Sequence, residues 1–539
     1  MFSVAVYTLG CKLNQVESEA VADAFRREGF SLLPWDETAA VPPDILIINT
    51  CTVTSKADQK ARRLIRKALR DHPRSLVIVA GCYAQLESEA LEKLEAECAP
   101  VPRDASSRPP DRRLFVLKGG GKSAAAKGVL LDMPRFIRKA ASREGRAGED
   151  AGGPATAGDL RALVGSWAEG LQALYAGEGR AGECPPESAF RFTPEDFSCH
   201  TRGFLKIQDG CDNHCTYCRI RLARGPGVSL GAEQALAELR ELEAKGYAEV
   251  VLTGVNITQY RDCGAAAACG GKSGGDQKAC GLGELLAYLL EGTQRIALRL
   301  SSLDPEAVTG PFVGALAHRR IRPHFHLSVQ SGSAVILKKM GRNYGPETVE
   351  RAAALLRSVK DNPFLACDII TGFPGETGAE FEKTLALCRN TGFAWIHAFP
   401  YSKRPGTPAL FFRETVSERD ASRRMETLLE LARRGRQGYV RQWQGREIEV
   451  LIEEGGTEKT GYCRGTSENY LKLLVKYAGG HTPPPGTVLR CKITSPPSRE
   501  NTPNSDLEYD SEAVEIKMNH TNRPKGPEFP LPPVRMVSD

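Results

Sequence analysis

Three cysteines in one short segment are the residues whose type and spacing point most directly to chemistry. Cys211, Cys215 and Cys218 form a C-x3-C-x2-C run. Three thiolates at this spacing can ligate three irons of a four-iron cubane and leave the fourth iron open. An open iron can chelate the amino and carboxylate groups of S-adenosylmethionine and pass an electron to its sulfonium. The run therefore predicts radical chemistry at an iron–sulfur centre.

A structural zinc site is the alternative reading of the same run. Zinc normally takes four protein ligands arranged in two pairs. His214 could be the fourth ligand, but it lies between two of the cysteines and its coordination would strain the loop. Ligand number and spacing therefore favour the cluster over zinc.

Three further cysteines follow apolar segments near the N-terminus. Each apolar segment is followed by a helical pattern, an alternation that predicts a small parallel α/β domain. Cys11, Cys51 and Cys82 each come just after one of these segments. Because ligands of open parallel sheets bind beyond the carboxyl ends of the strands, the three thiols should converge. The predicted strands are Ser3–Thr8, Asp44–Asn49 and Ser75–Ala80.

Regular strand–helix alternation resumes at Gly203 and continues for about 200 residues, a length that suits a partial (β/α)6 barrel of the TIM type. The C-x3-C-x2-C run follows the first strand of this barrel, at the carboxyl end where barrel enzymes carry their chemistry. A Gly/Ala-rich insertion covers 261–281. The six predicted strands are Gly203–Ile207, Glu249–Thr253, Arg295–Leu300, His324–Val329, Phe364–Ile370 and Ala394–Phe399.

The remaining segments have different characters. A stretch rich in Gly, Ala, Arg and Glu precedes the barrel and predicts a flexible insertion, with a helix possible over Leu160–Tyr175. A long charged helix is expected over Val416–Arg436. Short β-like runs after it, at Glu447–Glu453, Asn469–Val475 and Val488–Ile493, predict a small antiparallel β-barrel. The Pro-rich last twenty or so residues are expected to be disordered.

The bulk composition bounds the class of protein. The 539 residues carry a formal charge of +6, which permits a nucleic-acid partner without requiring one. The sequence contains no run of about eighteen apolar residues, so no membrane span is expected. The first residues lack the features of a signal peptide. A cytoplasmic protein is therefore expected. In that reducing compartment its sixteen cysteines indicate metal chemistry rather than disulfides.

Nine motifs give the chain a specific resemblance. It resembles the methylthiotransferase family of radical enzymes, and within that family the tRNA N6-threonylcarbamoyladenosine methylthiotransferases. The resemblance covers 1–98 and about 202–500. The matching segments are TLGCKLNQVES, NTCTVTSKADQKARR, AGCYAQ, KIQDGCDNHCTYC, VVLTGVNITQY, LRLSSLDP, HFHLSVQSGS, DIITGFPGET and FPYSKRPGTPA, with the small C-terminal β-barrel resembling the family's TRAM RNA-binding module.

The resemblance implies two 4Fe–4S clusters, each with one iron free of protein ligands. Cys211, Cys215 and Cys218 would hold the cluster that binds exchangeable S-adenosylmethionine. The second triad, formed by the N-terminal cysteines, would hold an auxiliary cluster that carries sulfur. The implied domains are a cluster domain (1–135), an insertion (136–200), a radical core (201–436), a TRAM-like barrel (437–517) and a tail (518–539).

The resemblance also implies the reaction and its partners. One S-adenosylmethionine methylates sulfur, and a second yields the radical that removes hydrogen from C2 of N6-threonylcarbamoyladenosine at tRNA position 37. The clusters and cofactor carry this chemistry, so no catalytic side chain is expected. The partners would be the tRNA anticodon loop and a reductant such as flavodoxin or ferredoxin, without a membrane, and the chain is expected to be a monomer.

Side chains at the predicted strand ends are candidate contacts of the cofactor. An aromatic residue inside the cysteine loop would lie beside its adenine, and polar groups and glycines would bind its other parts. These candidates are Tyr217, Gly254, Asn256, Ser301, Gln330, Gly372 and Gly375. Asp368 and Glu376 are expected to make local polar contacts, since a carboxylate cannot break an unactivated C–H bond.

Other polar residues and cysteines carry weaker predictions. Lys403 and Arg404 are candidate phosphate ligands, as are the basic residues of the segment 62–67, although a solvated helix face explains the latter better. Cys263, Cys269 and Cys280 look like a third cysteine motif, but their Gly/Ala-rich surroundings indicate surface thiols.

Three rival functions remain open at this point. The same chemistry could act on N6-isopentenyladenosine in tRNA or on an aspartate of a ribosomal protein. The residues of the motifs NTCTVTSKAD and FPYSKRPGT favour the subfamily that acts on N6-threonylcarbamoyladenosine. A rival from another class is a zinc-dependent RNA-binding protein without catalysis.

Overall fold

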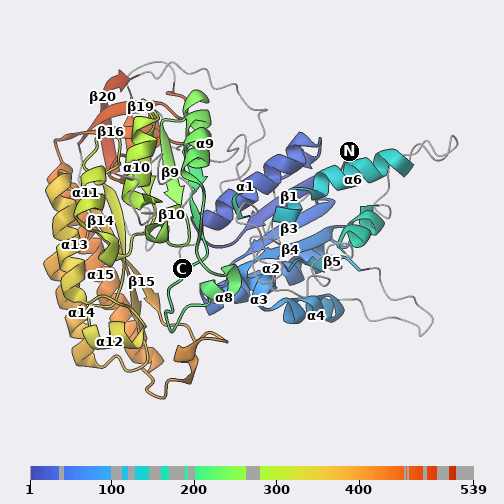
Figure 1. Cartoon of the computed structure of the whole chain (residues 1–539), viewed down its shortest axis with the longest axis horizontal. Helices are drawn as coiled ribbons and strands as arrows, with labels where there is room; N and C mark the ends of the chain where they lie inside the picture. The colour runs from blue at the N-terminus through green and yellow to red at the C-terminus, as the bar shows by residue number, and fades with distance from the viewer. Residues whose placement is uncertain are drawn as a thin grey trace, which may run out of the picture.

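The structure is a computed structural model and describes most of the chain (Figure 1). The described residues are 2–34, 42–98, 112–118, 128–144, 160–168, 189–191, 201–262, 280–454, 457, 461–477, 482–494 and 509–517. None of the helices among them is long and apolar enough to cross a membrane.

The N-terminal domain is a three-layer α/β unit built on a five-stranded parallel sheet with the order β2-β1-β3-β4-β5. Its central strands are continuous apolar runs because helices cover both of their faces. The strands are β1 (Ser3–Thr8), β2 (Ser31–Leu32), β3 (Ile45–Thr50), β4 (Leu76–Gly81) and β5 (Leu114–Val116). The helices are α1 (Lys12–Arg27), α2 (Ser55–Asp71), α3 (Cys82–Leu86), α4 (Ser88–Cys98) and α6 (Met133–Glu144).

One part of the predicted insertion contributes to this domain. Residues 160–168 are helical, and Leu160, Val164 and Trp167 are buried in the same apolar cluster as Phe25 of α1. The helix considered over Leu160–Tyr175 is therefore present at 160–168, and the expectation of a flexible insertion was wrong for these residues. Apolar side chains spaced at helical intervals give it one face that can be buried.

The second domain is a partial barrel of six parallel strands. Two three-stranded sheets, β12-β9-β6 and β13-β14-β15, are joined through bridges that pair Leu298 with Ile321 and Leu303 with Leu327. The strands are β6 (Gly203–Lys206), β9 (Glu249–Thr253), β12 (Ala297–Leu300), β13 (His324–Gln330), β14 (Phe364–Thr371) and β15 (Trp395–Pro400). The predicted six-unit barrel is confirmed.

Helices surround this barrel on its outer side (Figure 1). They are α9 (Ala232–Ala244), α10 (Leu282–Glu291), α11 (Gly310–Leu316), α12 (Ala334–Lys339), α13 (Pro346–Val359), α14 (Gly378–Thr391) and α15 (Glu418–Trp443). The short helix α8 (Ile220–Arg224) lies instead at the junction with the N-terminal domain, where it contacts α3. Short elements join them: η2 (Ile257–Gln259), η3 (Pro305–Ala307), η4 (Pro408–Phe411), β7 (Gln208–Asp209), β8 (Val228–Ser229), β10 (Arg261–Asp262) and β11 (Cys280–Gly281).

Two expectations about the barrel domain require correction. The helical pattern over Pro305–Ala317 predicts a single helix, but the structure has two elements there. The short η3 ends at Ala307 and α11 begins at Gly310, with Pro311 in its first turn, where the missing N–H is tolerated. Cys280 was expected to be a surface thiol. Its side chain is buried at the start of α10, because β10 and β11 pair at Asp262 and Cys280 and close the base of the insertion. Cys263 and Cys269 lie outside the described residues.

The third domain is a closed five-stranded barrel with the order β16-β17-β18-β20-β19. Its strands are β16 (Glu447–Ile452), β17 (Tyr462–Ser467), β18 (Lys472–Lys476), β19 (Val488–Ile493) and β20 (Tyr509–Lys517). The pairs are antiparallel as predicted except that β18 and β20 run parallel. Strands β17 and β20 were not predicted. YCRGTS, the sequence of β17, contains a glycine and several polar residues, which weaken a strand signal.

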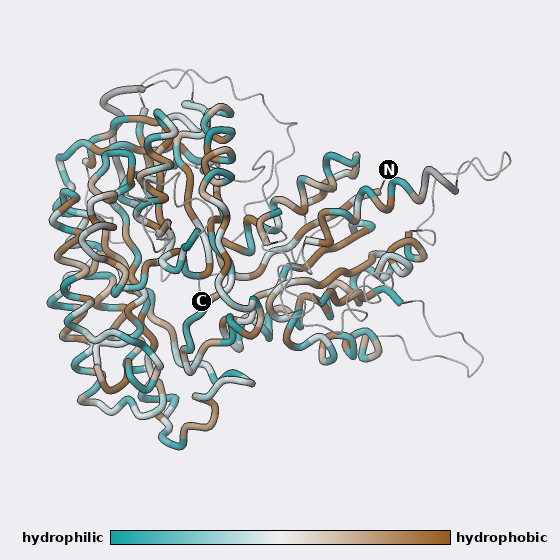
Figure 2. Tube along the Cα trace, viewed as in Figure 1, coloured by the Kyte–Doolittle hydropathy of each residue, from teal (hydrophilic) through white to brown (hydrophobic). Residues whose placement is uncertain are grey.

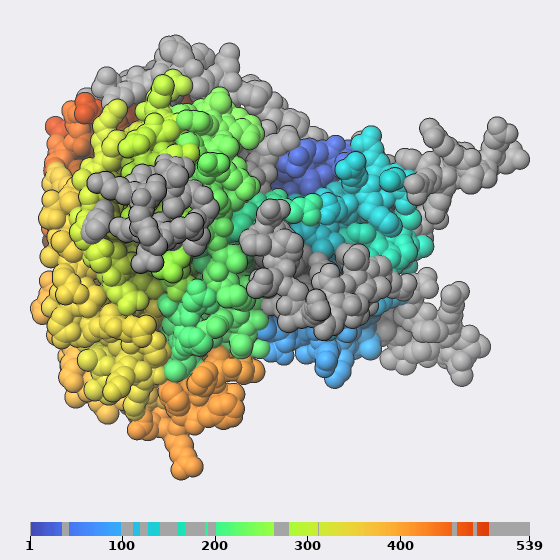
Figure 3. Space-filling model, viewed as in Figure 1, coloured from blue at the N-terminus to red at the C-terminus, as the bar shows by residue number. Residues whose placement is uncertain are grey.

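The three domains meet around the inside of the partial barrel. The C-terminal barrel packs on the first residue of β14 and on the end of α15, through Phe364, Tyr439 and Trp443. It therefore lies at the amino end of the barrel strands, away from the cysteine loop. The N-terminal domain lies against the open side of the partial barrel (Figures 1 and 3). Figure 2 shows hydrophobic segments along the strands of the N-terminal sheet.

Candidate active site

The cysteine loop after β6 is held by backbone contacts on several sides. The Cys211 amide donates to Gly225 O at 3.1 Å, and the Thr216 amide donates to Met340 O at 2.9 Å. Gly210 has φ +69° and approaches Pro226 O so closely that a Cβ there would overlap that oxygen. A residue with a side chain could not make this turn. Contacts with other parts of the fold therefore hold the loop on several sides.

The three thiols of this loop, Cys211, Cys215 and Cys218, lie close enough to influence one another. Burial raises the pKa of Cys218 to about 12, and its neighbours Cys215 and Cys211 add to the rise. Burial likewise raises the pKa of Cys211 to about 11. Burial opposes ionisation of these thiols, whereas the positive charge of bound iron would hold them as thiolates. Three thiols gathered in one loop are a donor set that suits such a cluster.

The zinc alternative does not fit this loop. His214 is exposed, and its ring contacts the Arg221 guanidinium. No group of three or more His, Cys, Asp or Glu side chains among the described residues is placed to hold a single metal ion. Zinc would need sulfur ligands at about 2.3 Å from one centre, whereas thiolates on a cubane bind different irons and stand further apart.

The second triad forms as predicted at one edge of the N-terminal sheet. Cys11 precedes α1, Cys51 follows β3, and Cys82 opens α3 directly after β4. Burial raises the pKa of Cys51 to about 12, and the nearby Cys11 and Cys82 thiols add to the rise. A Cβ at Gly10, which has φ +106°, would lie 2.7 Å from Cys51 Sγ, so glycine makes room for this thiol. The three thiols therefore influence one another at this edge of the sheet, and their role as ligands of one cluster stays a prediction.

A buried ion network joins the two cysteine triads. The Arg224 guanidinium lies 2.9 Å from Glu17 of α1 and 2.9 Å from Asp209, which precedes the cysteine loop. Lys206 completes the network, with its Nζ 3.0 Å from Glu17 and 2.7 Å from Asp209. All four side chains are almost fully buried. Two carboxylates and two cations balance, so the charges compensate one another inside the interface.

A polar network missed by the sequence analysis supports the cysteine loop from the barrel side. Asp304 accepts from Asn256 Nδ2 at 2.7 Å and from Asn213 Nδ2 at 3.1 Å. Arg342 donates to Asp304 at 3.2 Å and to the Tyr217 hydroxyl at 3.1 Å. Asp304 lies in the LRLSSLDP motif, but single polar residues after a strand carry no spacing signal, and only the fold brings them together.

Three other predicted cofactor contacts lie at strand ends, as expected. Gly254 follows β9, where a Cβ would lie 2.8 Å from Gln208 O, so close packing alone already requires glycine. The Ser301 amide donates to Leu252 O at 3.1 Å, which leaves its side chain at the end of β12. Gln330 ends β13 with φ +67°, a strained conformation for a residue with a side chain. Strain of this kind is concentrated at functional sites.

The two predicted glycines after β14 have packing neighbours. A Cβ at Gly372 would lie 2.9 Å from the Ala421 Cβ of α15, and a Cβ at Gly375 would press on the ion pair between Lys339 and Glu414. Both glycines have positive φ. Their close approach to protein accounts for glycine at these positions, and their role beside adenine stays a prediction.

Glu376 and Asp368 make the local polar contacts that were expected. Glu376 accepts from the Gly372 amide at 2.7 Å and from Arg424 at 2.6 Å. Asp368 Oδ1 lies 2.9 Å from His326 Nε2 inside the barrel. Glu376 is therefore a support for the turn after β14, whereas Asp368 lines the lumen.

The prediction that Arg404 meets phosphates was wrong. Its guanidinium is buried and donates to Asp58 Oδ2 at 2.6 Å and to Thr52 Oγ1 at 2.6 Å. Thr52 follows Cys51, so Arg404 fixes the N-terminal triad against the barrel. Lys403 next to it is exposed, and its role as a phosphate ligand stays a prediction.

Arg62, Arg66 and Lys67 of α2 already have partners within the N-terminal domain. Arg62 donates to the Tyr83 hydroxyl, Arg66 pairs with Glu97, and Lys67 pairs with Asp71. These contacts agree with the solvated-helix interpretation.

Tyr470 of the C-terminal barrel connects that domain to the N-terminal triad. It has φ +71° in the turn between β17 and β18, and its ring stacks on His324 at 4.3 Å. The pKa of Tyr470 is lowered to about 7 although its side chain is buried, and the positive charge of Lys12, adjacent to Cys11, is the largest cause. Four cations lie within about 6 Å of the ring centre. They are Lys12 at 5.6 Å, Arg202 at 5.7 Å, Arg299 at 5.1 Å and Lys472 at 6.0 Å.

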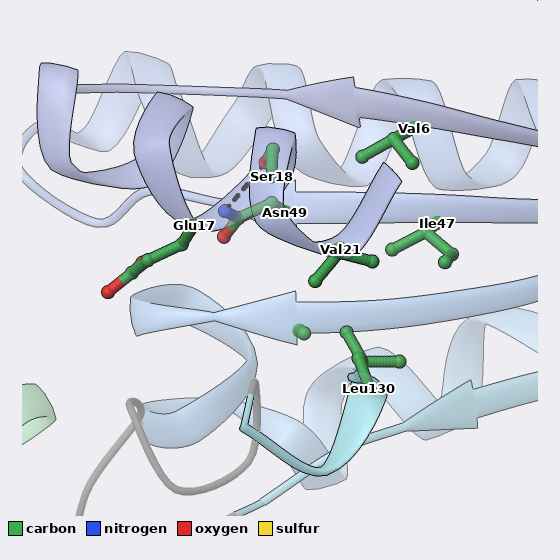
Figure 4. Close-up of a pocket in the computed structure, with 8 residues that line it drawn as sticks. Val6, Glu17, Ser18, Val21, Ile47, Asn49 and Leu130 are labelled. Carbon is green, nitrogen blue, oxygen red and sulfur yellow. Dashed lines mark hydrogen bonds between the residues drawn. The ribbon is translucent and has the colours of Figure 1, made fainter. Parts of the chain in front are cut away.

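A cavity inside the N-terminal domain is not part of this site. It has a volume of about 10 Å³ and lies among Val6, Val21, Ile47 and Leu130. Figure 4 shows Asn49 hydrogen-bonded to Ser18 at its edge, and Glu17 turned away from it. The space is at most that of one water molecule, so it cannot bind a substrate.

Comparisons with known proteins agree with this geometry. The model of the uncharacterized protein family UPF0004 matches residues 3–101, and the radical SAM superfamily model matches residues 205–388. The two matches coincide with the N-terminal domain and the partial barrel. The chain is therefore a radical S-adenosylmethionine enzyme.

Curated relatives define the family more narrowly. Threonylcarbamoyladenosine tRNA methylthiotransferase MtaB of Treponema pallidum is 39% identical over 92% of this chain and 98% of the relative. The enzyme of the same name from Thermotoga maritima is 32% identical over 88% and 91%, respectively. The chain belongs to the threonylcarbamoyladenosine tRNA methylthiotransferase family. It is a tRNA methylthiotransferase whose cofactors are iron–sulfur clusters and S-adenosylmethionine.

A solved structure shows a more distant likeness. The radical S-adenosylmethionine methyltransferase TsrM of Kitasatospora setae is 14% identical, with a TM-score of 0.43 over 76% of each chain.

Proposed function

We propose that this enzyme replaces the C2 hydrogen of N6-threonylcarbamoyladenosine at position 37 of tRNA with a methylthio group. The observation that supports this most is the pair of cysteine triads, one on each side of a single domain interface. One triad would hold a cluster whose open iron would supply the electron that cleaves S-adenosylmethionine, and the other would hold a cluster that supplies the sulfur. In the proposed reaction, removal of hydrogen and transfer of the methylthio group take place at C2 of the same adenine base.

We assign Cys211, Cys215 and Cys218 to the cluster that binds S-adenosylmethionine, and Cys11, Cys51 and Cys82 to the auxiliary cluster. The mutual electrostatic influence of the thiols within each triad supports the assignment. The chain itself would exclude water from the space between them and orient the base and cofactor there. Tyr217 and Asn256, fixed by Arg342 and Asp304, would bind the cofactor beside the loop.

We assign the C-terminal β-barrel to tRNA binding as a TRAM-like module, and divide the chain as the sequence suggested, except that 160–168 belongs with the N-terminal domain. The target base would leave the anticodon loop and enter the lumen of the partial (β/α)6 barrel. We further propose that the enzyme acts in the cytoplasm as a monomer, with a flavodoxin or ferredoxin as its reductant.

Nucleoside analysis by mass spectrometry tests the reaction. Reconstituted holoenzyme should convert N6-threonylcarbamoyladenosine in tRNA to its 2-methylthio derivative and release 5′-deoxyadenosine. A matched tRNA carrying N6-isopentenyladenosine should remain unchanged. Turnover of the isopentenyl substrate alone would overturn the proposal.

A further inference from the structure

Three polar side chains line the inside of the barrel on neighbouring strands. His326 is on β13, Asp368 on β14 and His397 on β15, and Asp368 pairs in register with His397. Residues next to them in sequence, such as Leu327, Cys367 and Ile396, are buried in the core beneath the helices. Because side chains alternate along a strand, the three polar groups point to the opposite side, into the lumen.

The three groups form one compact cluster. His326 Nε2 lies 2.9 Å from Asp368 Oδ1, and the two imidazole rings stack with centres 5.0 Å apart. Asp368 and His326 each keep about a fifth of their side-chain surface exposed. The Nε2 atom of His326 is buried, and although it is near the carboxylate, it has no well-aligned hydrogen bond among the described residues. Buried polar atoms of this kind normally have a partner, so the cluster is suited to a polar ligand.

The cluster lies within electrostatic reach of both cysteine triads. Arg342, which contacts the Tyr217 hydroxyl in the cysteine loop, contributes to lowering the pKa of Asp368. Lys12, adjacent to Cys11, contributes to lowering the pKa of His397. A group bound at the cluster would therefore lie within electrostatic reach of residues that flank both triads.

The protonation of these groups defines what the cluster can bind. Burial opposes ionisation of Asp368, but His326 outweighs it and lowers the pKa of that carboxyl, so Asp368 is a charged acceptor. Burial lowers the pKa of His397 to about 4, so its ring is neutral at pH 7. The Trp395 indole N–H donates to His397 Nδ1 at 3.4 Å, which leaves the proton on Nε2. His397 is therefore an N–H donor beside a carboxylate acceptor.

We infer that His326, Asp368 and His397 read the N6-carbamoyl edge of the target adenine, an inference that rests on the proposed function. Asp368 would accept a urea N–H, and His397 Nε2 would donate to the carbamoyl oxygen or a ring nitrogen. A phosphate does not suit the cluster, because Asp368 would repel it. An isopentenyl group has no polar atoms and would leave these buried groups unpaired. Sites built to hydrogen-bond a substrate reject analogues that lack the bonding group.

Binding and turnover of short RNAs test this inference. Reconstituted holoenzyme is titrated with anticodon stem–loops that differ only at position 37: N6-threonylcarbamoyladenosine, N6-isopentenyladenosine or adenosine. The wild type should prefer the carbamoylated RNA to the other two. His397→Phe removes the donor and should reduce that preference about tenfold, the value of one good hydrogen bond. His397→Gln keeps an N–H donor and should recover part of it.

Two controls separate recognition from folding and cofactor binding. His318→Phe changes an exposed histidine outside the barrel lumen and should leave the preference unchanged. Cleavage of S-adenosylmethionine without RNA should proceed in His397→Phe as in the wild type.

The outcomes separate this inference from the proposed function. An unchanged preference in His397→Phe, with the wild type active on the carbamoylated RNA, overturns the inference alone. A wild type that methylthiolates none of the RNAs overturns the proposed function, whatever the binding data show.

Discussion

The two cysteine triads reach similar surroundings by different routes. Cys211, Cys215 and Cys218 lie within eight residues, in one loop that turns at Gly210 and is held by the Met340 carbonyl. Cys11, Cys51 and Cys82 lie on three separate strand–helix connections, and only the parallel sheet brings them together. The first triad is a property of a loop, and the second is a property of a fold.

This difference predicts different vulnerabilities. The local triad should persist as long as its loop is intact. The N-terminal triad also depends on three interface contacts that hold it against the rest of the chain: the network around Arg224, the pair of Arg404 and Asp58, and the ring of Tyr470 beside Lys12. The predictions below test each in turn.

Loss of a ligand should have the largest effect and should distinguish the triads. Cys215→Ala should abolish both 5′-deoxyadenosine and the methylthio product, because S-adenosylmethionine loses its iron. Cys51→Ala should abolish the methylthio product but keep cleavage of S-adenosylmethionine. Iron content and both products are measured on reconstituted protein. Cys98→Ala, outside both triads, is the control, and equal loss of cleavage in both ligand variants would contradict the separate roles.

Breaking the network between the triads should be the next largest effect. Arg224→Met leaves Glu17 and Asp209 buried with only Lys206 as a cation, which should cost about 3–5 kcal/mol of unfolding free energy. Urea unfolding followed by circular dichroism measures it. Arg221→Met, a more exposed position on the same helix, should cost less than about 1 kcal/mol. Similar costs for the two variants would show that the network does not hold the interface.

Removal of Arg404 should affect the N-terminal triad more than the local one. Arg404→Met leaves the buried carboxylate of Asp58 without its cationic partner and should lower the free energy of unfolding by about 2 kcal/mol. Because Thr52 loses the same partner, the methylthio product should fall further than 5′-deoxyadenosine does. Lys403→Met is the matched exposed control. A parallel fall in both products would mean that Arg404 supports the whole chain rather than the Cys51 loop.

Tyr470 should give the smallest effect, visible as a pH dependence. Its folded pKa of about 7 is below the usual value of 10, so the phenolate contributes stability above pH 10, and that contribution is lost as pH falls through 7. Between pH 7 and 8 the unfolding free energy should rise by about 1 kcal/mol. Tyr470→Phe should flatten this rise in urea unfolding at each pH. The same slope in Tyr470→Phe would assign the rise to another group.

The sequence alone determined the fold class and singled out the six cysteines as candidate cluster ligands. Strand–helix alternation predicted both α/β units, since hydrophobic periodicity is local information. Motif spacing predicted the loop triad, and the rule that ligands gather at strand ends predicted that the N-terminal thiols meet. The helix at 160–168 was underestimated and β17 was missed, because their signals depend on partners distant in sequence.

Only the tertiary structure decided which polar residues face one another. The sequence predicts Arg404 to be a phosphate ligand, whereas in the fold its guanidinium is buried and paired with Asp58, 346 residues away. The lumen cluster of His326, Asp368 and His397 needs three strands in register, and no spacing along the chain encodes it. A sequence specifies what each residue can do, whereas burial and charge compensation depend on neighbours that only the folded chain supplies.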